Sequence, residues 1–183
     1  ACMLMSMTRS FIRANSQRFD NLNGLMHELN RNLYRDTDTE RFITVACCLL
    51  DRREGTVKFA RAGHCELLIH LPGHKVRKIY PNGSALGLLP PEMTEDFETF
   101  SFKFLPGMSL LIFTDGITEA INETGEEFGL DRTLEIFSQA SERGESPSQT
   151  VDRILGEVEK FTGDYPQSDD QTLAVIRHME IPS

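Results

Sequence analysis

The sequence predicts a single α+β domain, and three observations lead to this prediction. The chain has 183 residues, of which 39% are hydrophobic and 26% charged, a composition typical of one ordinary globular domain. Its patterns run in the order two helices, a run of strands, two helices and a closing strand. The strands are joined by short turns, which predicts antiparallel pairing and excludes alternating parallel units.

Two amphipathic helices open the pattern. Leu4, Met7 and Phe11 recur at helical spacing and predict a helix over residues 1–14. No capping residue precedes this helix, so we expect it to begin at or before the first residue. We expect Met3, Met5 and Met7 to pack in a core, as methionines usually do. The second helix is predicted from Phe19 to Leu33, and Asp36-Thr37-Asp38-Thr39 ends it.

Three hairpins are expected in the middle of the chain. Phe42 to Leu50 is apolar at nearly every position, which predicts a strand that is buried on both faces and central in its sheet. A turn at residues 51–55 returns this strand into Thr56 to Ala60. The other two hairpins pair Leu67–Ile69 with Val76–Tyr80 and Phe100–Phe104 with Ser109–Thr114.

The last third of the chain returns to helical spacing. Leu130, Leu134 and Phe137 mark one helix, and apolar residues from Val151 to Phe161 mark another. The second of these has clear boundaries, since Ser146 and Gln149 form a capping box, Pro147 occupies the first turn and Gly163 follows the last. Thr172 to Ile176 is expected to be the closing strand.

Charge and apolar runs exclude some classes of partner. The formal net charge of −9 argues against nucleic acid and anionic lipid as partners. The longest apolar run, Val45 to Leu50, is far shorter than the roughly 20 residues of a membrane-spanning helix. The four cysteines form no C-x-x-C pair, which favours free thiols in a reducing compartment and predicts a cytoplasmic location.

Carboxylates occur where two predicted strands end and begin. Thr114-Asp115-Gly116 follows one strand, and Ser168-Asp169-Asp170-Gln171-Thr172 precedes the other. Mg²⁺ and Mn²⁺ prefer oxygen ligands on rigid elements, and Asp115 and Asp169 suit that role. A simpler interpretation is that Asp115-Gly116 is a turn and Asp169-Asp170 a solvated start of a strand. Spacing alone does not decide between these two interpretations.

The order of the motifs resembles one known family. The segment Leu110 to Ala120, followed by Gly125 to Gly129, is similar to the T-D-G-[VI]-T-E-A region of PPM-type (2C class) metal-dependent protein serine/threonine phosphatases, in their bacterial SpoIIE-like branch. Asp169 to Thr172 is similar to the family's D-D-x-T strand. Three further segments resemble its N-A-G-H, P-L-G-[LIV] and A-L-L-M-A motifs, namely Ala62-Gly63-His64, Ala85-Leu86-Gly87-Leu88 and Leu4-Met5-Ser6. The resemblance covers essentially all of the chain.

The resemblance implies a fold and a metal site. The fold is a four-layer α-β-β-α sandwich of two antiparallel sheets flanked by helices, with two Mn²⁺ or Mg²⁺ ions in a cleft between the sheets. The ions activate a water that attacks phosphorus, and no phosphoenzyme forms. Asp115 and Asp169 would each give a carboxylate oxygen to an ion, and Gly116 belongs to the same metal site. Asp170 would lie beside the ions or at a third ion.

The sequence departs from the family at two places. Relatives carry a D-x-S-G-[HK]-G segment before the A-L-L-M-A helix, and its Asp bridges the ions, whereas this sequence starts after that point. We therefore expect residues 1–183 to be a phosphatase domain whose early strands and first metal-binding Asp lie upstream. Alone, it would be inactive and would form a homodimer or another complex. The second departure is Arg61, where relatives have Asn, which would alter only a strand-end hydrogen bond.

The resemblance implies partners as well as an activity. The substrate would be a phosphorylated regulatory protein, namely a small anti-sigma-factor antagonist, and a sensor or receiver domain upstream would control the enzyme. The acidic residues Glu119, Glu123, Glu126 and Glu127 form a solvated surface or steer a basic substrate surface, and His64 has a structural role. Two alternatives remain, a non-catalytic module that signals by binding and, more remotely, a metal-dependent nuclease.

Overall fold

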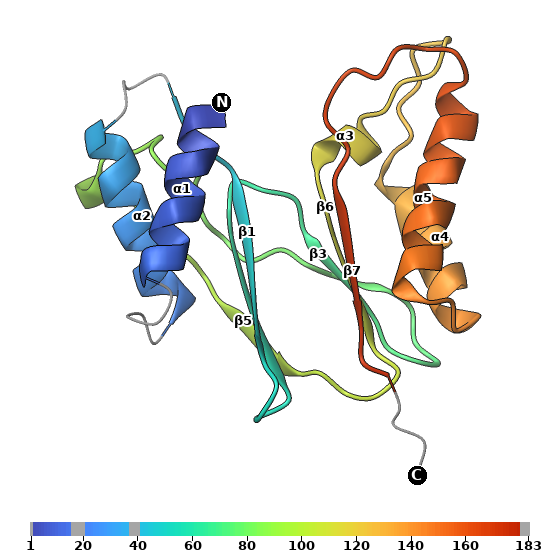
Figure 1. The fold of residues 1–183 in the computed structure, drawn as a ribbon, viewed down its shortest axis with the longest axis horizontal. Helices are drawn as coiled ribbons and strands as arrows, with labels where there is room; N and C mark the ends of the chain where they lie inside the picture. The colour runs from blue at the N-terminus through green and yellow to red at the C-terminus, as the bar shows by residue number, and fades with distance from the viewer. Residues whose placement is uncertain (1, 16–20, 37–40, 180–183) are drawn as a thin grey trace. The chain divides into compact units, whose positions relative to one another are not determined.

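The computed structural model describes residues 2–15, 21–36 and 41–179. The chain divides into two compact units, a first unit of Ala1–His64 with Tyr80–Lys103 and a second unit of Cys65–Ile79 with Phe104–Ser183. Each unit contains one antiparallel sheet with helices packed against it (Figure 1). The predicted α+β class with two antiparallel sheets and flanking helices is therefore confirmed.

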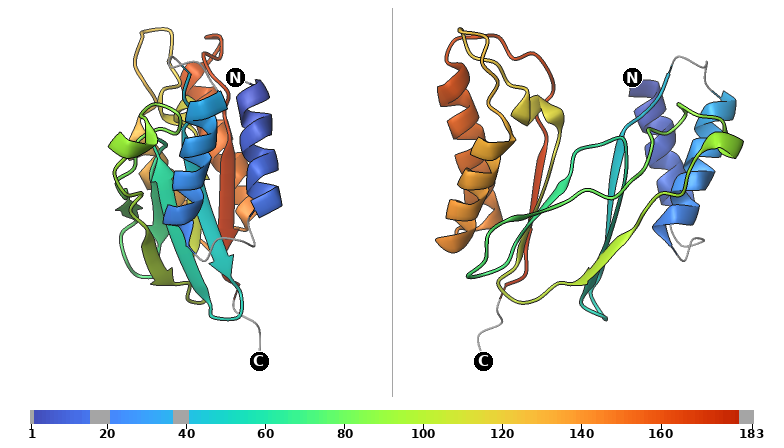
Figure 2. Two further views of the ribbon diagram at one scale, coloured as in Figure 1. Left: turned by 90° about the vertical axis from the view of Figure 1, so that its left-hand side faces the viewer. Right: turned by 180° about the vertical axis from the view of Figure 1, so that it is seen from behind.

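The first unit packs two helices on a three-stranded sheet. Helices α1 (Cys2–Asn15) and α2 (Leu22–Asp36) lie side by side in both views of Figure 2. The sheet has the order β1-β2-β5, and a 3₁₀ helix, η1 (Pro91–Met93), precedes β5. Its strands are β1 (Val45–Asp51), β2 (Thr56–Ala62) and β5 (Phe100–Lys103). The predicted start at Ala1, Phe19 and the predicted stop at residues 37–39 lie outside the described residues.

Two predictions for the first unit are wrong. Strand β1 pairs with β2 as predicted, but β2 is the central strand and β1 lies at one end of the strand order. Leu49 is 48% exposed, so β1 is not buried on both faces. An apolar run shows that a strand has contacts, but it does not show how many strands adjoin it. Met3, Met5 and Met7 are exposed rather than packed, because Leu4 takes the core-facing position of α1.

The second unit combines a four-stranded sheet with two long helices and one short helix. The strand order is β4-β3-β6-β7, and α5 packs on β7 while α4 packs on β3 and α5. The strands are β3 (Leu67–His70), β4 (Arg77–Ile79), β6 (Ser109–Phe113) and β7 (Leu173–Arg177). The helices are α3 (Asp115–Thr118), α4 (Leu130–Glu142) and α5 (Pro147–Thr162). The second predicted hairpin, β3 with β4, is confirmed.

The third predicted hairpin is wrong. Strand β5 pairs with β2 in the first unit, whereas β6 pairs with β3 and β7 in the second. The turn between them does form, since the Met108 amide donates to the Leu105 carbonyl at 3.1 Å. Strand β6 is buried along most of its length and has a neighbour on each side, while β5 exposes Ser101 and Lys103 as an outer strand does.

The predicted boundaries of α5 are confirmed. The Ser146 hydroxyl accepts a hydrogen bond from the Gln149 amide at 3.3 Å, and the Gln149 side chain accepts one from the Ser146 amide at 2.9 Å. Gly163 ends the helix with a positive φ of 57°. These caps hold in place the helix that leads into the loop before β7.

The described cysteines and the lengths of the described helices bear on two expectations from the sequence. Cys47, Cys48 and Cys65 are half-buried free thiols, and burial raises the pKa of Cys48 to about 11. Within the ranges that the structure describes, no helix is long and apolar enough to cross a membrane.

Candidate metal-binding site

The topology of the second sheet brings the two carboxylate segments to one edge. Strands β6 and β7 are antiparallel neighbours, with Phe113 opposite Leu173. The residue after β6 and the residues before β7 therefore lie at the same end of the sheet, where α3 adjoins the segment that leads into β7 (Figure 1). Asp115 follows the first strand and Asp169 and Asp170 precede the second, so the pairing places the segments that carry the three predicted carboxylates at the same end of the sheet.

Thr114 joins the two segments through hydrogen bonds. Its backbone amide donates to the Thr172 carbonyl at 3.1 Å. Its hydroxyl accepts a hydrogen bond from the Thr172 amide at 2.9 Å and donates one to the Asp170 carbonyl at 3.0 Å. One side chain thus satisfies a donor and an acceptor of the opposite segment, which fixes the backbone on both sides of the carboxylates.

Gly116 allows the closest approach between these segments. A Cβ atom at this position would lie 2.5 Å from the Asp170 carbonyl oxygen, which is a severe overlap with backbone. Gly116 is buried in the four-residue helix α3, so the missing side chain leaves room for the opposite backbone rather than for solvent. The T-D-G sequence therefore has a packing reason for its glycine.

Two of the three carboxylates each accept one backbone hydrogen bond, and all three are exposed. One oxygen of Asp115 accepts a hydrogen bond from the Gly116 amide at 3.1 Å. One oxygen of Asp169 accepts from the Asp170 amide at 2.7 Å. All three side chains are exposed, so carboxylate oxygens on a rigid edge face solvent. This donor set fits Mg²⁺ or Mn²⁺, which take oxygen ligands and retain several waters.

Cys65 is a neighbour of this edge that the sequence analysis did not single out. It precedes β3, which pairs with β6. Burial, together with the negative charges of Asp115, Glu66 and Glu119, raises the pKa of its thiol to about 11. The thiol is therefore neutral near pH 7 when no metal is bound. Its environment indicates an acidic edge of the sheet.

The described residues do not by themselves form a metal-binding cluster. Among residues 2–15, 21–36 and 41–179, no three His, Cys, Asp or Glu side chains are arranged to bind one ion. The metal roles of Asp115, Gly116, Asp169 and Asp170 thus stay predictions. Sequence reasoning missed Thr114, although a threonine directly after a buried strand and before Asp-Gly was a usable signal.

Arg61 has a structural place in the first unit. Its side chain is 6% exposed, and its Nη1 donates to the His64 carbonyl at 2.7 Å. Its guanidinium carbon lies 3.3 Å from the centre of the Tyr80 ring, a close cation–π contact. His64 in turn has its Nδ1 3.2 Å from the Thr44 hydroxyl. These contacts go beyond the altered strand-end hydrogen bond expected from sequence.

Solved structures define the class of this fold. The SiaA-PP2C domain of Pseudomonas aeruginosa is 18% identical, with a TM-score of 0.78 covering 96% of this chain and 68% of that chain. The PP2C phosphatase domain of Bacillus subtilis SpoIIE, solved with a fragment of its regulatory domain, is 20% identical. Its TM-score is 0.77, covering 96% of this chain and 49% of that chain. The fold is that of PP2C phosphatase domains.

Sequence comparison defines the family. Residues 1–179 match the family model described as Stage II sporulation protein E (SpoIIE), and the chain belongs to that family. Among curated proteins, Protein IcfG of Synechocystis is 27% identical over 139 residues. That match covers 76% of this chain and 21% of the relative, so the chain spans about a fifth of the length of this relative.

Proposed function

We propose that this chain is a metal-dependent protein serine/threonine phosphatase domain. One observation carries the proposal: Asp115, Asp169 and Asp170 lie at one edge of a PP2C-type fold, on segments that Thr114 ties together. Exposed carboxylates at paired strand ends are suited to hold divalent cations for phosphoryl transfer. The family supports the same reaction class.

The proposed cofactors are two Mn²⁺ or Mg²⁺ ions. A structure of RsbX with the same fold, 14% identical and with a TM-score of 0.64, was solved in complex with magnesium. Asp115 and Asp169 would hold the ions, with Gly116 and Asp170 beside them. When bound, such ions neutralise charge on the phosphoryl oxygens and make a nucleophile from water.

This chain's own residues position the carboxylates. Thr114 and Gly116 set the separation of the two segments, so Asp115 and Asp169 start from fixed backbones. Fixed ligands reduce the reorganisation that a phosphoryl transfer site would otherwise need during the reaction. No side-chain nucleophile is required, and the neutral Cys65 thiol takes no part.

The proposed substrate is a phosphoserine or phosphothreonine on a regulatory protein, such as an anti-sigma-factor antagonist. The solved SpoIIE structure pairs its phosphatase domain with part of a regulatory domain, which supports an upstream control domain here. The free, half-buried thiols support a reducing compartment, the cytoplasm.

The test is substitution of the two central carboxylates in the parent protein. We expect Asp115→Asn and Asp169→Asn each to lower Mn²⁺-dependent hydrolysis of a phosphoserine peptide by about 100-fold or more. The melting temperature should change little, because clustered carboxylates repel one another without metal. Asp152→Asn, an exposed carboxylate on α5, is the control. Retention of most activity in either edge variant would contradict the proposal.

A non-catalytic binding module is the second candidate. It is favoured by the finding that, in the described part of the chain, no three metal-type side chains converge. A parent protein that binds a phosphorylated partner with Mn²⁺ present, yet releases no phosphate, would support this candidate against the phosphatase.

A further inference from the structure

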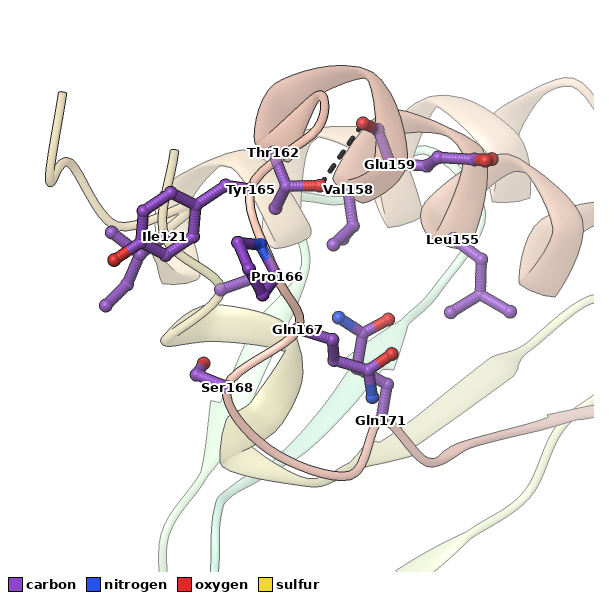
Figure 3. Close-up of a pocket in the computed structure, with 11 residues that line it drawn as sticks. Ile121, Leu155, Val158, Glu159, Thr162, Tyr165, Pro166, Gln167, Ser168 and Gln171 are labelled. Atoms are coloured by element: carbon purple, nitrogen blue, oxygen red, sulfur yellow. Dashed lines mark hydrogen bonds between the residues drawn. The ribbon is translucent and has the colours of Figure 1, made fainter. Parts of the chain in front are cut away.

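A pocket of about 300 Å³ lies in the second unit beside the candidate metal site (Figure 3). It is enclosed by the C-terminal half of α5, by residues 120–121 and by the loop of residues 165–171. Its apolar residues are Ala120, Ile121, Leu155, Val158 and Pro166, and its polar residues are Glu159, Thr162, Tyr165, Gln167, Ser168 and Gln171.

The pocket shares a wall with the candidate metal site. The loop that lines it also carries Asp169 and Asp170 between Ser168 and Gln171. The Gln167 side-chain amide donates to the Asp169 carbonyl at 2.7 Å, so a pocket residue directly braces a carboxylate-bearing residue. A group bound in the pocket would therefore touch the same loop that presents Asp169.

The walls suit a long side chain with a charged tip. Figure 3 shows Leu155 and Val158 projecting from α5 toward the side chains of Gln167 and Gln171 on the loop. Glu159 is the only Asp, Glu, Lys, Arg or His among the lining residues, and it forms no ion pair with any residue in the described ranges. The neighbouring Lys160 pairs instead with Glu157. An apolar stem and a cationic tip would match these groups.

The size and surroundings select the occupant. A volume near 300 Å³ is at the lower limit of small-molecule sites, so the pocket holds a side chain rather than a nucleotide. The neighbouring exposed residues Glu119, Glu123 and Asp164 are acidic, which favours a positive group. We propose that this pocket binds a lysine or arginine side chain of the protein substrate, close in sequence to the phosphorylated residue.

This inference rests on the proposed phosphatase function and assigns a specificity site to it. The methylene stem of the basic residue lies along Leu155 and Val158. Its cationic head meets the Glu159 carboxylate. The phosphoryl group then lies at the other face of the loop, toward Asp115 and Asp169, so the distance across the loop sets the spacing between the two substrate residues.

The first test compares phosphoserine peptides hydrolysed by the parent protein with Mn²⁺. The peptides differ only in one residue, lysine or glutamine, moved through the positions within about four of the phosphoserine. We expect lysine at one position to raise kcat/KM roughly fivefold, the size typical of one half-exposed ion pair. Glu159→Gln should remove the preference, and Glu159→Lys should transfer it to a peptide with glutamate at that position. The control Asp152→Asn, on the same helix, should keep the lysine preference.

The second test measures binding without catalysis. Fluorescence anisotropy of the labelled lysine phosphopeptide is recorded with the metal-free parent protein, and we expect Glu159→Gln to raise Kd by roughly fivefold. A Glu159-dependent preference in binding without phosphate release would sustain the pocket and reject the phosphatase function. Hydrolysis that is equal for lysine and glutamine peptides at every position would overturn the pocket and leave the phosphatase function intact.

Discussion

The two units of the chain differ in the ionisable groups that they bury and expose. The first unit buries the cation of Arg61 in β2, where a carbonyl and the Tyr80 ring receive it. The second unit buries His70 in β3 at 1% exposure, and neither ring nitrogen has a hydrogen-bond partner among the described residues. The second unit also exposes Asp115 and Asp169 at its sheet edge.

The difference shows which charges are structural and which are available to a ligand. Arginine cannot lose its proton in a protein, so a buried guanidinium needs partners. Histidine can become neutral, and burial does lower the pKa of His70. Asp115 and Asp169 are exposed, and each accepts only one backbone amide hydrogen bond, which leaves the other carboxylate oxygen facing solvent. They are therefore available to an external cation.

The largest effect should come from a substitution at Gly116, which would disturb the close approach of the two carboxylate segments. Gly116→Ala places a methyl group against the Asp170 carbonyl, and we expect it to cost about 2 kcal/mol of unfolding free energy and most of the metal-dependent activity. Gly156→Ala in α5 is the matched control, since nothing lies within 4 Å of the added atom. That variant should gain roughly 0.5–1 kcal/mol. Urea unfolding of both variants checks the contrast, and equal stabilities would contradict the close approach.

The buried cation of the first unit offers the next largest effect. Arg61→Lys should cost about 1.5 kcal/mol, because an ammonium cannot lie flat on the Tyr80 ring while it donates to the His64 carbonyl. A double-mutant cycle with Tyr80→Leu should give a coupling of roughly 1 kcal/mol. Additive effects in the cycle would mean that the ring contact contributes nothing.

Removal of the Thr114 hydroxyl tests the tie between the carboxylate segments. Thr114→Val keeps the shape but leaves the Thr172 amide and the Asp170 carbonyl without their partner, at a cost of about 1 kcal/mol. Thr114→Ser retains the hydroxyl and should restore most of this loss. Hydrogen exchange at the Thr172 amide measures the effect directly, and unchanged protection in Thr114→Val would contradict it.

The smallest effect concerns the pH dependence of stability that comes from the buried His70 of the second unit. Burial, and to a lesser extent Arg177, lowers the pKa of His70, while Glu142 opposes this shift. The unfolded chain then binds a proton more readily, so His70 contributes full stability above about pH 6.5 and loses it as the pH falls toward the folded pKa. His70→Leu should make the fall in melting temperature between pH 7 and pH 5 shallower. The exposed His74→Gln should not, and equal slopes would show that His70 is not neutral when folded.

Periodicity predicted the helices and most strands well, but it could not predict which strands share a sheet. The short turn through Pro106 and Gly107 is typical of a hairpin, yet the strands on its two sides belong to different units. A turn reverses the chain direction without selecting the neighbours of each strand. Strand β6 has β3 on one side and β7 on the other, and β7 is remote from it in sequence.

The position of the carboxylates at one end of the sheet was predictable, whereas the contacts that hold their two segments together were not. Asp115 and Asp169 stood out because each adjoins a predicted strand. The hydroxyl of Thr114 and the overlap at Gly116 depend on the distance between two backbones, which no local pattern contains. The pocket is a further example, since its walls come from α5, the segment after α3 and the loop before β7.

The pairing of β7 with β6 also sets an order of events during synthesis. More than fifty residues separate Asp115 from Asp169, and α4 and α5 lie between them. A nascent chain that has completed α5 can bury much of its second core, yet it lacks the strand that delivers Asp169 and Asp170. Closure of so long a loop is slow relative to local helix formation. The carboxylate edge is therefore among the last parts of this unit to form.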